Sequence, residues 1–310
     1  MEKRKLGRTG FEVTVLGFGG GPVGISEVAQ DPITEILNKV LDSGINLIDT
    51  AQAYKGSEEA IGNAVSHRRD EFVLVSKCGL PAQGPDEEAW QPATIAKVVD
   101  QALKRLKTDH LDVMLLHSCA KETLVRGEAM GALVKARAAG KIRHLGYSGD
   151  NDDAVYAAGL DDVAVIETSI NFCDQANIDS LLPLARERDI GIITKRSIAN
   201  AAWKGAEEQN GFYVNYVKPY VARLEKMAIT PADLGFDGPA DKVWPEIALR
   251  FTIAQPGVTT AIVGTTNPAR IAPNVATAEK GALPADAIAK LRDAFAKAEK
   301  ASGEKWPGMR

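Results

Sequence analysis

Residues 31–50, DPITEILNKVLDSGINLIDT, contain the pattern that decides the fold. Pro32 suits the first turn of a helix capped by Asp31, and apolar residues recur at helical spacing as far as Leu41. Gly44 provides a left-handed stop, and the apolar run 45–48 follows at once as a strand that ends at Asp49. A helix followed directly by a strand is the repeating unit of a parallel sheet.

The same alternation continues almost to residue 300. Strands are expected at residues 13–18, 45–48, 72–75, 112–116, 142–146, 163–166, 190–194 and 260–263. Later helices are expected at about 94–106, 122–139, 176–188, 245–254 and 285–300, with shorter ones near residues 152 and 270. About eight strand–helix units predict a (β/α)8 TIM barrel, and no linker divides residues 1–310, so we expect a single domain. The interruption at 198–242 is predicted to be a loop over the barrel mouth containing a short helix near Tyr216.

Composition narrows the possible partners. The 310 residues carry a net charge of -4 and have no basic tract, which argues against nucleic acid. No apolar run reaches the ~18 residues of a membrane helix, and no signal-peptide core follows the start, so no membrane partner is expected. Cys78, Cys119 and Cys173 fit no disulfide framework, which favours a reducing, cytoplasmic location.

Three expected strands are followed closely by an ionisable residue: Asp49, Lys77 and His117. In a barrel the C-terminal strand ends share one rim, where active sites form. A buried lysine requires a carboxylate partner, which Asp49 would supply. Tyr54, on the loop after Asp49, could reach the same place, and a neighbouring ammonium would lower its pKa and make it a better proton donor.

These residues lie in motifs that resemble those of the aldo-keto reductases. The matching runs are DTAQAY at 49–54 with GSE at 56–58, VSK at 75–77, LLH at 115–117 and GYS at 146–148. The resemblance implies that Tyr54 is the general acid, that Lys77 lowers its pKa, that Asp49 pairs with the lysine and that His117 orients a carbonyl. It also implies an N-terminal β-hairpin, here about residues 4–13, that closes the barrel base, and direct hydride transfer from a nicotinamide cofactor to a small-molecule carbonyl substrate.

The resemblance further implies the cofactor contacts. The residues at the matching positions are Ser148, Glu167, Asn171, Arg196, Ser197, Gly264, Thr265, Thr266, Asn267, Arg270 and Asn274. A guanidinium at Arg270 could pair with a 2′-phosphate, so NADPH is the expected cofactor. Four residues depart from the family pattern: Gly149 replaces an asparagine, Glu167 a glutamine, Arg196 the aromatic ring that stacks on nicotinamide, and Pro273 an acidic residue near the adenine. A monomer is the family-level expectation.

Other interpretations stay open at this stage. GGGPVG at 19–24 matches a dinucleotide-binding fingerprint, but the following helix is expected only at Pro32 and Asp49 is too distant, so a turn at the barrel mouth is favoured. The three cysteines and His117 could serve a metal-assisted hydrolase, although no Cys-x-x-Cys spacing exists and no metal is expected. A cofactor-binding redox sensor of low activity is the second alternative.

Overall fold

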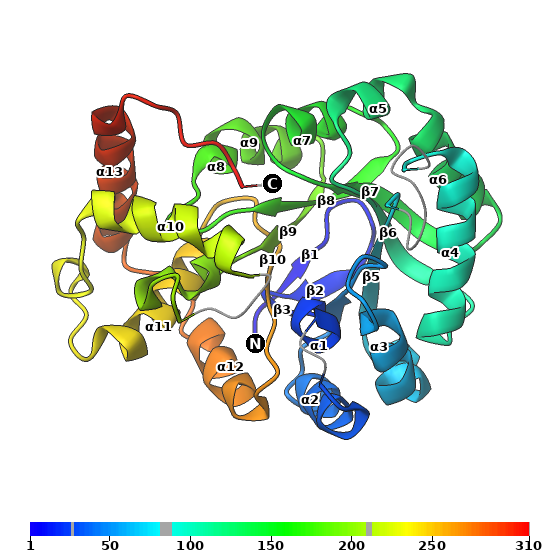
Figure 1. Cartoon of the computed structure of the whole chain (residues 1–310), viewed down its shortest axis with the longest axis horizontal. Coiled ribbons are helices and arrows are strands. Elements are labelled where there is room, and N and C mark those ends of the chain that lie inside the picture. Colours follow the sequence, from blue (N-terminus) through cyan, green and yellow to red (C-terminus); the bar gives the residue numbers. More distant parts are fainter. Residues whose placement is uncertain (26–27, 81–88, 209–212, 310) are drawn as a thin grey trace.

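The computed structural model describes residues 1–25, 28–80, 89–208 and 213–309. Eight parallel strands close into a barrel in the order β10-β3-β4-β5-β6-β7-β8-β9, surrounded by helices (Figure 1). Their bounds are β3 Leu16–Gly19, β4 Leu47–Asp49, β5 Val73–Cys78, β6 Leu111–His117, β7 Ile142–Ser148, β8 Val163–Ser169, β9 Gly191–Lys195 and β10 Thr260–Val263. The predicted barrel is confirmed, and several strands extend beyond their apolar runs to include the polar residues that follow.

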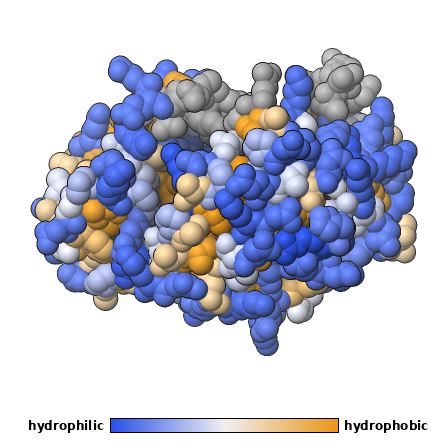
Figure 2. Space-filling model, turned by 90° about the horizontal axis from the view of Figure 1, so that it is seen from below, coloured by the Kyte–Doolittle hydropathy of each residue, from blue (hydrophilic) through white to orange (hydrophobic). Residues whose placement is uncertain are grey.

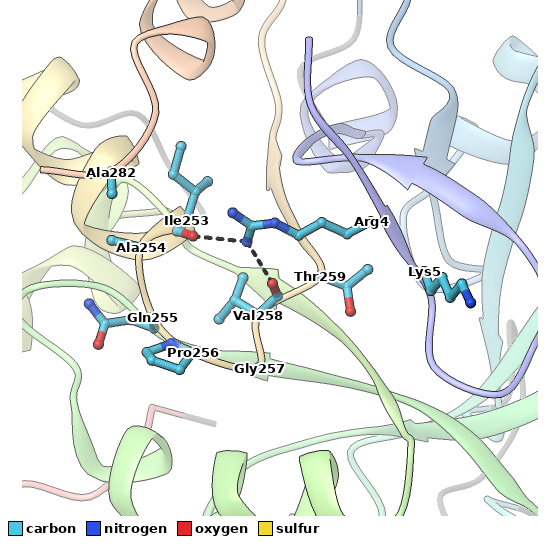
Figure 3. Close-up of a pocket in the computed structure, with 10 residues that line it drawn as sticks. All are labelled: Arg4, Lys5, Ile253, Ala254, Gln255, Pro256, Gly257, Val258, Thr259 and Ala282. Carbon is cyan, nitrogen blue, oxygen red and sulfur yellow. Dashed lines mark hydrogen bonds between the residues drawn. The ribbon is translucent and has the colours of Figure 1, made fainter.

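The predicted N-terminal hairpin is also confirmed. Strands β1 (Lys3–Lys5) and β2 (Glu12–Thr14) pair antiparallel, with Arg4 opposite Val13. Arg4 donates through Nη1 to the carbonyls of Ile253, at 2.9 Å, and Val258, at 2.8 Å (Figure 3). These bonds lie in a hollow of about 360 Å³ next to the start of β10, at the opposite end of the barrel from the rim described below. The hollow therefore belongs to the closed base.

The helices cover the outside of the barrel. They are α1 Gly21–Ile25, α2 Gln30–Asp42, α3 Ser57–Val65, α4 Pro92–Leu106, α5 Lys121–Arg126, α6 Glu128–Ala138, α7 Asn151–Ala158, α8 Ala176–Ser180, α9 Leu182–Glu187, α10 Tyr213–Met227, α11 Ala240–Ile253, α12 Ile271–Glu279 and α13 Ala285–Ser302. Short 3₁₀ turns occur at η1 Ser66–Glu71, η3 Ala199–Lys204, η4 Ala232–Leu234 and η5 Pro268–Arg270.

Some predicted helix bounds are wrong. The helix expected at 122–139 is two helices, because Gly127 adopts a left-handed conformation with φ 75° between α5 and α6. The helix expected at 176–188 is likewise divided at Leu181. Helix α2 begins at Gln30, so Asp31 lies in its first turn rather than at the cap, where a negative charge still favours the helix dipole.

Two segments at the barrel mouth differ more. The glycine-rich run was expected to form a turn, but the short helix α1 starts at Gly21. The closed barrel nevertheless excludes the open Rossmann sheet. Segment 198–242 was expected to be a loop, yet η3, α10 and η4 make it largely helical and α11 starts within it at Ala240; residues 209–212 lie outside the described residues. Its apolar residues pack in a second core with α13, which stabilises those helices.

Side chains alternate along each strand between two cores. Leu47, Val75, Val113, Leu115 and Val165 point into the barrel, whereas their strand neighbours pack outward against the helices. On the face shown in Figure 2, hydrophobic residues are interspersed among hydrophilic ones. Within the described part of the chain, no helix combines the length and hydrophobicity needed to span a bilayer.

Candidate active site

Strand alternation explains why four side chains meet inside the rim. Asp49 lies two residues after Leu47, Lys77 two after Val75, His117 two after Leu115 and Glu167 two after Val165, so all four continue the inward rows. The rows come from β4, β5, β6 and β8. The C-terminal strand ends therefore bring the predicted strand-end residues together, as a barrel requires.

Lys77 is the centre of this cluster and is only 1% exposed. Its Nζ donates to Oδ1 and Oδ2 of Asp49, each at 2.7 Å, and to the carbonyl of Thr50 at 3.0 Å. The Oε2 atom of Glu167 lies 3.1 Å from the same nitrogen. One buried ammonium is thus shared by two buried carboxylates.

The loop that carries Tyr54 is fixed at both ends. Thr50 donates its amide to the carbonyl of Val75 at 2.9 Å, and its hydroxyl lies 2.8 Å from the hydroxyl of Ser57. Ser57 donates this hydroxyl to the carbonyl of Gly20 and its amide to the carbonyl of Tyr54, both at 2.8 Å. The tyrosine is therefore held over the rim by its backbone.

The aromatic ring of Tyr54 faces the cluster. Its centroid lies 5.0 Å from Lys77 Nζ and 6.1 Å from the centroid of the His117 ring, which meets it edge-on at 88°. Burial raises the pKa of Tyr54 to about 12; Lys77 opposes this, while Glu167 and Asp49 reinforce it. The predicted effect of the lysine is present, but it does not produce the net lowering expected from the sequence, because burial and two carboxylates outweigh it.

The neighbouring groups are also perturbed. Burial, together with the cations Lys77, Lys195 and Arg196, lowers the pKa of His117 well below its usual value, so the imidazole is neutral at neutral pH. Burial disfavours the Lys77 ammonium, but the carboxylates of Asp49 and Glu167 outweigh it and raise the pKa of Lys77. Burial and the charge of Glu167 raise the pKa of Asp49 against the effect of the lysine.

The residues expected to contact nicotinamide lie on the same rim but differ in availability. Ser148 and Glu167 are buried and 3.5 Å apart, from Oγ to Oε1. Asn171 has both ends of its side chain occupied, since Nδ2 donates to the carbonyl of Arg196 at 3.0 Å and Oδ1 accepts from the amide of Cys173 at 2.8 Å. Ser197 donates to the carbonyl of Thr194 at 2.8 Å. The Asn171 side chain therefore binds neighbouring loop backbone, and that of Ser197 binds the end of β9.

Arg196 has an unexpected set of partners. Its Nη1 donates to Ser169 Oγ at 2.7 Å and to the carbonyl of Met309 at 2.5 Å, and its guanidinium lies 4.6 Å from the centroid of the Tyr216 ring. Residues 303–309 lead from the end of α13 back to the strands near β8, and 306–309 form the part that contacts the mouth (Figure 1). Sequence reasoning missed this contact, because nothing local in the chain indicates it.

Side chains from several elements hold the 306–309 segment. Arg223 donates to the carbonyl of Pro307 at 2.8 Å, and Asp174 Oδ2 accepts from the amide of Met309 at 3.0 Å. Asn151 and Gly308 form a reciprocal pair at 2.9 and 2.6 Å. The segment is thus a fixed part of the mouth.

The glycine that replaces the usual asparagine has a structural explanation. A Cβ atom at Gly149 would lie 2.3 Å from the hydroxyl of Tyr147, which donates to the carbonyl of Cys119 at 2.7 Å. The tyrosine ring thus occupies the space that a side chain at position 149 would need. The sequence could have indicated this, because Tyr147 and Gly149 point to the same side of the strand end.

Residues 264–274 lie after β10, on the rim. Asn267 caps η5, its Oδ1 accepting from the amide of Ala269 at 2.9 Å, and its own amide donates to Thr265 Oγ1 at 3.0 Å. Thr265 is buried, Gly264, Thr266 and Asn274 are partly buried, and Arg270 is exposed. The Arg270 guanidinium forms no ion pair with any residue that the structure describes.

The metal interpretation gains no support from the cysteines. All three side chains are buried, and burial raises the pKa of the thiols of Cys78 and Cys173. Across residues 1–25, 28–80, 89–208 and 213–309 no group of three His, Cys, Asp or Glu side chains is arranged to hold a metal ion.

Comparison with known proteins agrees with this geometry. The chain is 27% identical over 291 residues to L-galactose dehydrogenase of Arabidopsis thaliana, covering 89% of this chain and 88% of that protein. It is 27% identical over 212 residues to the NADH-specific methylglyoxal reductase of Escherichia coli, covering 61% and 65%. An aldo-keto reductase from Bacillus halodurans, solved in its holo form, has the same fold, with a TM-score of 0.78 and 24% identity over 95% of this chain and 96% of that one.

Aldo-keto reductases are oxidoreductases that use a nicotinamide cofactor and act on small-molecule carbonyl compounds. The model of the Aldo/keto reductase family matches residues 15–295, which include every residue of the Lys77 cluster. The chain therefore belongs to the aldo-keto reductase family.

Proposed function

We propose that this protein reduces an aldehyde or ketone to an alcohol with NADPH as hydride donor. The observation that carries the proposal is the buried Lys77–Asp49 pair beneath the ring of Tyr54, with the neutral imidazole of His117 at the edge of that ring. A bound nicotinamide would supply the hydride, and the protein must supply a proton and hold the carbonyl oxygen.

Tyr54 is the proposed proton donor. With its pKa raised to about 12 by burial, it keeps its proton at neutral pH and can give it to the carbonyl oxygen as that oxygen gains negative charge. The ammonium of Lys77 stabilises the phenolate that remains, and Asp49 holds the ammonium in place. His117, kept neutral, can donate a hydrogen bond to the same oxygen and orient it.

The rim offers groups that fit the cofactor. Glu167 Oε1 lies 3.5 Å from Ser148 Oγ while its Oε2 is ion-paired with Lys77 at 3.1 Å, and this carboxylate with the serine is proposed to receive the carboxamide. Arg270 is exposed and can pair with a 2′-phosphate, which favours NADPH, although the similar protein from Escherichia coli is NADH-specific. Gly264, Thr265, Thr266, Asn267 and Asn274 are proposed to line the adenosine end, whereas Asn171, Ser197 and Arg196 shape the nicotinamide end.

The test is to measure NADPH oxidation with a panel of aldehydes and ketones, using the fall in NADPH absorbance as the readout. Wild-type protein should turn over at least one class of carbonyl, and Tyr54→Phe should lower kcat/KM by ~100-fold or more, since general acids contribute about that much. Turnover by the variant within a few-fold of wild type would remove Tyr54 as the acid. Tight NADPH binding with no turnover on any carbonyl would favour the redox-sensor alternative.

We also propose that residues 1–310 act as a single-domain monomer in a reducing compartment such as the cytoplasm. Val125 is the only large hydrophobic side chain among the described residues that is exposed, so no apolar face for a second copy is evident there. The free thiols of Cys78 and Cys173 agree with a reducing location.

A further inference from the structure

Besides the proposed cofactor contact, Glu167 forms an ion pair with Lys77. Its side chain is 1% exposed, and its Oε2 atom lies 3.1 Å from Lys77 Nζ. Strands β5 and β8 are not neighbours in the barrel, so this ion pair crosses the interior. Two carboxyl groups therefore share a single ammonium in the buried group Asp49–Lys77–Glu167.

This group lies against Tyr54, whose ring centroid is 5.0 Å from Lys77 Nζ. The charged groups that act on the phenol are Lys77 and Arg196, which favour its ionisation, and Glu167 and Asp49, which oppose it. His117, the other titratable side chain against the ring, is neutral. A glutamine at position 167 would have the same length and could keep the contact with Ser148, but it would remove one of the two opposing charges.

We propose that Glu167 is a positioning residue for proton transfer: it shares the Lys77 ammonium with Asp49 and so withholds part of that positive charge from the hydroxyl of Tyr54. This rests on the proposed role of Tyr54 as proton donor for its kinetic consequence, but the charge coupling itself is a property of the protein alone. Tyr54 consequently stays protonated to a higher pH than a single Lys–Asp pair would allow.

The direct test is the titration of Tyr54 in protein without cofactor. Protein carrying ¹³C at the tyrosine Cζ gives one resonance per tyrosine, and Tyr54→Phe identifies the one of interest. In Glu167→Gln the phenolate should form about one pH unit or more below the wild-type midpoint, which is the size expected for removal of a nearby like charge. An unchanged midpoint would overturn the proposal.

Glu58→Gln is the matched control. Glu58 is also a buried carboxylate, 2.6 Å from both Ser76 Oγ and Arg105 Nη2, but it is not among the groups acting on Tyr54. Its replacement should leave the Tyr54 titration where it is in wild type. An equal shift in this variant would mean that loosened packing, rather than the charge at position 167, causes the effect.

The second measurement is the pH profile of kcat/KM with an aldehyde that the wild type reduces. The alkaline limb, where the donor loses its proton, should move to lower pH in Glu167→Gln, in step with the resonance. A purely structural role would lower the rate at every pH and leave the limb in place, which would contradict the proposal. If Tyr54→Phe remains fully active while the resonance of Glu167→Gln still moves, the proposed function fails and the charge coupling stands.

Discussion

Lys77 lies between two carboxylates, and this arrangement predicts unequal effects on stability. Replacing it in Lys77→Met leaves Asp49 and Glu167 buried together without a cation, which should lower the free energy of unfolding by ~3–5 kcal/mol. Asp49→Asn should lower the free energy of unfolding by less, because the ammonium still has the Glu167 carboxylate at 3.1 Å. Denaturant unfolding of both variants checks this order, and a larger loss for Asp49→Asn would contradict it.

Arg270 lies at the other end of the proposed cofactor site, and its replacement should affect the binding of NADPH and of NADH differently. Arg270→Ala should raise the Kd for NADPH by ~10–100-fold, the value of one or two hydrogen bonds to a charged group, while leaving the Kd for NADH within a few-fold. Since Arg270 is exposed, folding should be unaffected. Fluorescence titration with both nucleotides measures the effect; equal weakening of the two would remove the proposed contact with the 2′-phosphate.

Among the elements, the end of β7 and the middle of α6 predict opposite results for the same change from glycine to alanine. A Cβ at Gly149 would lie 2.3 Å from the hydroxyl of Tyr147, so Gly149→Ala should destabilise the protein by ~1–3 kcal/mol. Gly131, inside α6, has no neighbouring atom within 4 Å of its Cβ position, so Gly131→Ala should stabilise it by ~0.5–1 kcal/mol. Thermal unfolding of the two variants should show shifts of opposite sign; shifts of the same sign would refute the packing argument.

At this scale the sequence predicts what is decided locally. Apolar runs with glycine stops identify the barrel strands, and the inward alternation extends them to Asp49, Lys77 and His117. The division at Gly127 escapes prediction because a single glycine can also lie inside a helix. Helix α10 and the start of α11 depend on packing with α13, which only the folded chain provides. The same holds for Glu167, whose ion pair with Lys77 requires two strands to face each other across the closed barrel.

For the molecule as a whole, the buried carboxyl of Asp174 at the barrel mouth should make the stability of the fold depend on pH. Burial and the charge of Asp150 raise the pKa of Asp174 to about 6, although its Oδ2 accepts from the hydroxyl of Tyr220 and the amide of Met309. A raised carboxyl pKa stabilises the fold below the unfolded value of ~4, and this contribution is lost as the pH rises through about 6.

Between these two pH values the free energy of unfolding of the wild type should fall by ~2–3 kcal/mol because Asp174 ionises. Asp174→Asn should not show this fall. The wild-type Tm minus the variant Tm should become more negative as the pH increases from acid to neutral. Asp179→Asn, which removes an exposed carboxylate paired with Arg292, is measured in parallel as the control. A difference between wild type and Asp174→Asn that stays constant with pH would show that Asp174 does not titrate in this range.

The 306–309 segment comes later in the chain than the residues that hold it, from Asn151 to Glu299. On the ribosome, all eight strands of the barrel are therefore synthesised before the residues that fix the guanidinium of Arg196. The geometry around Arg196 is therefore completed only when this late segment docks.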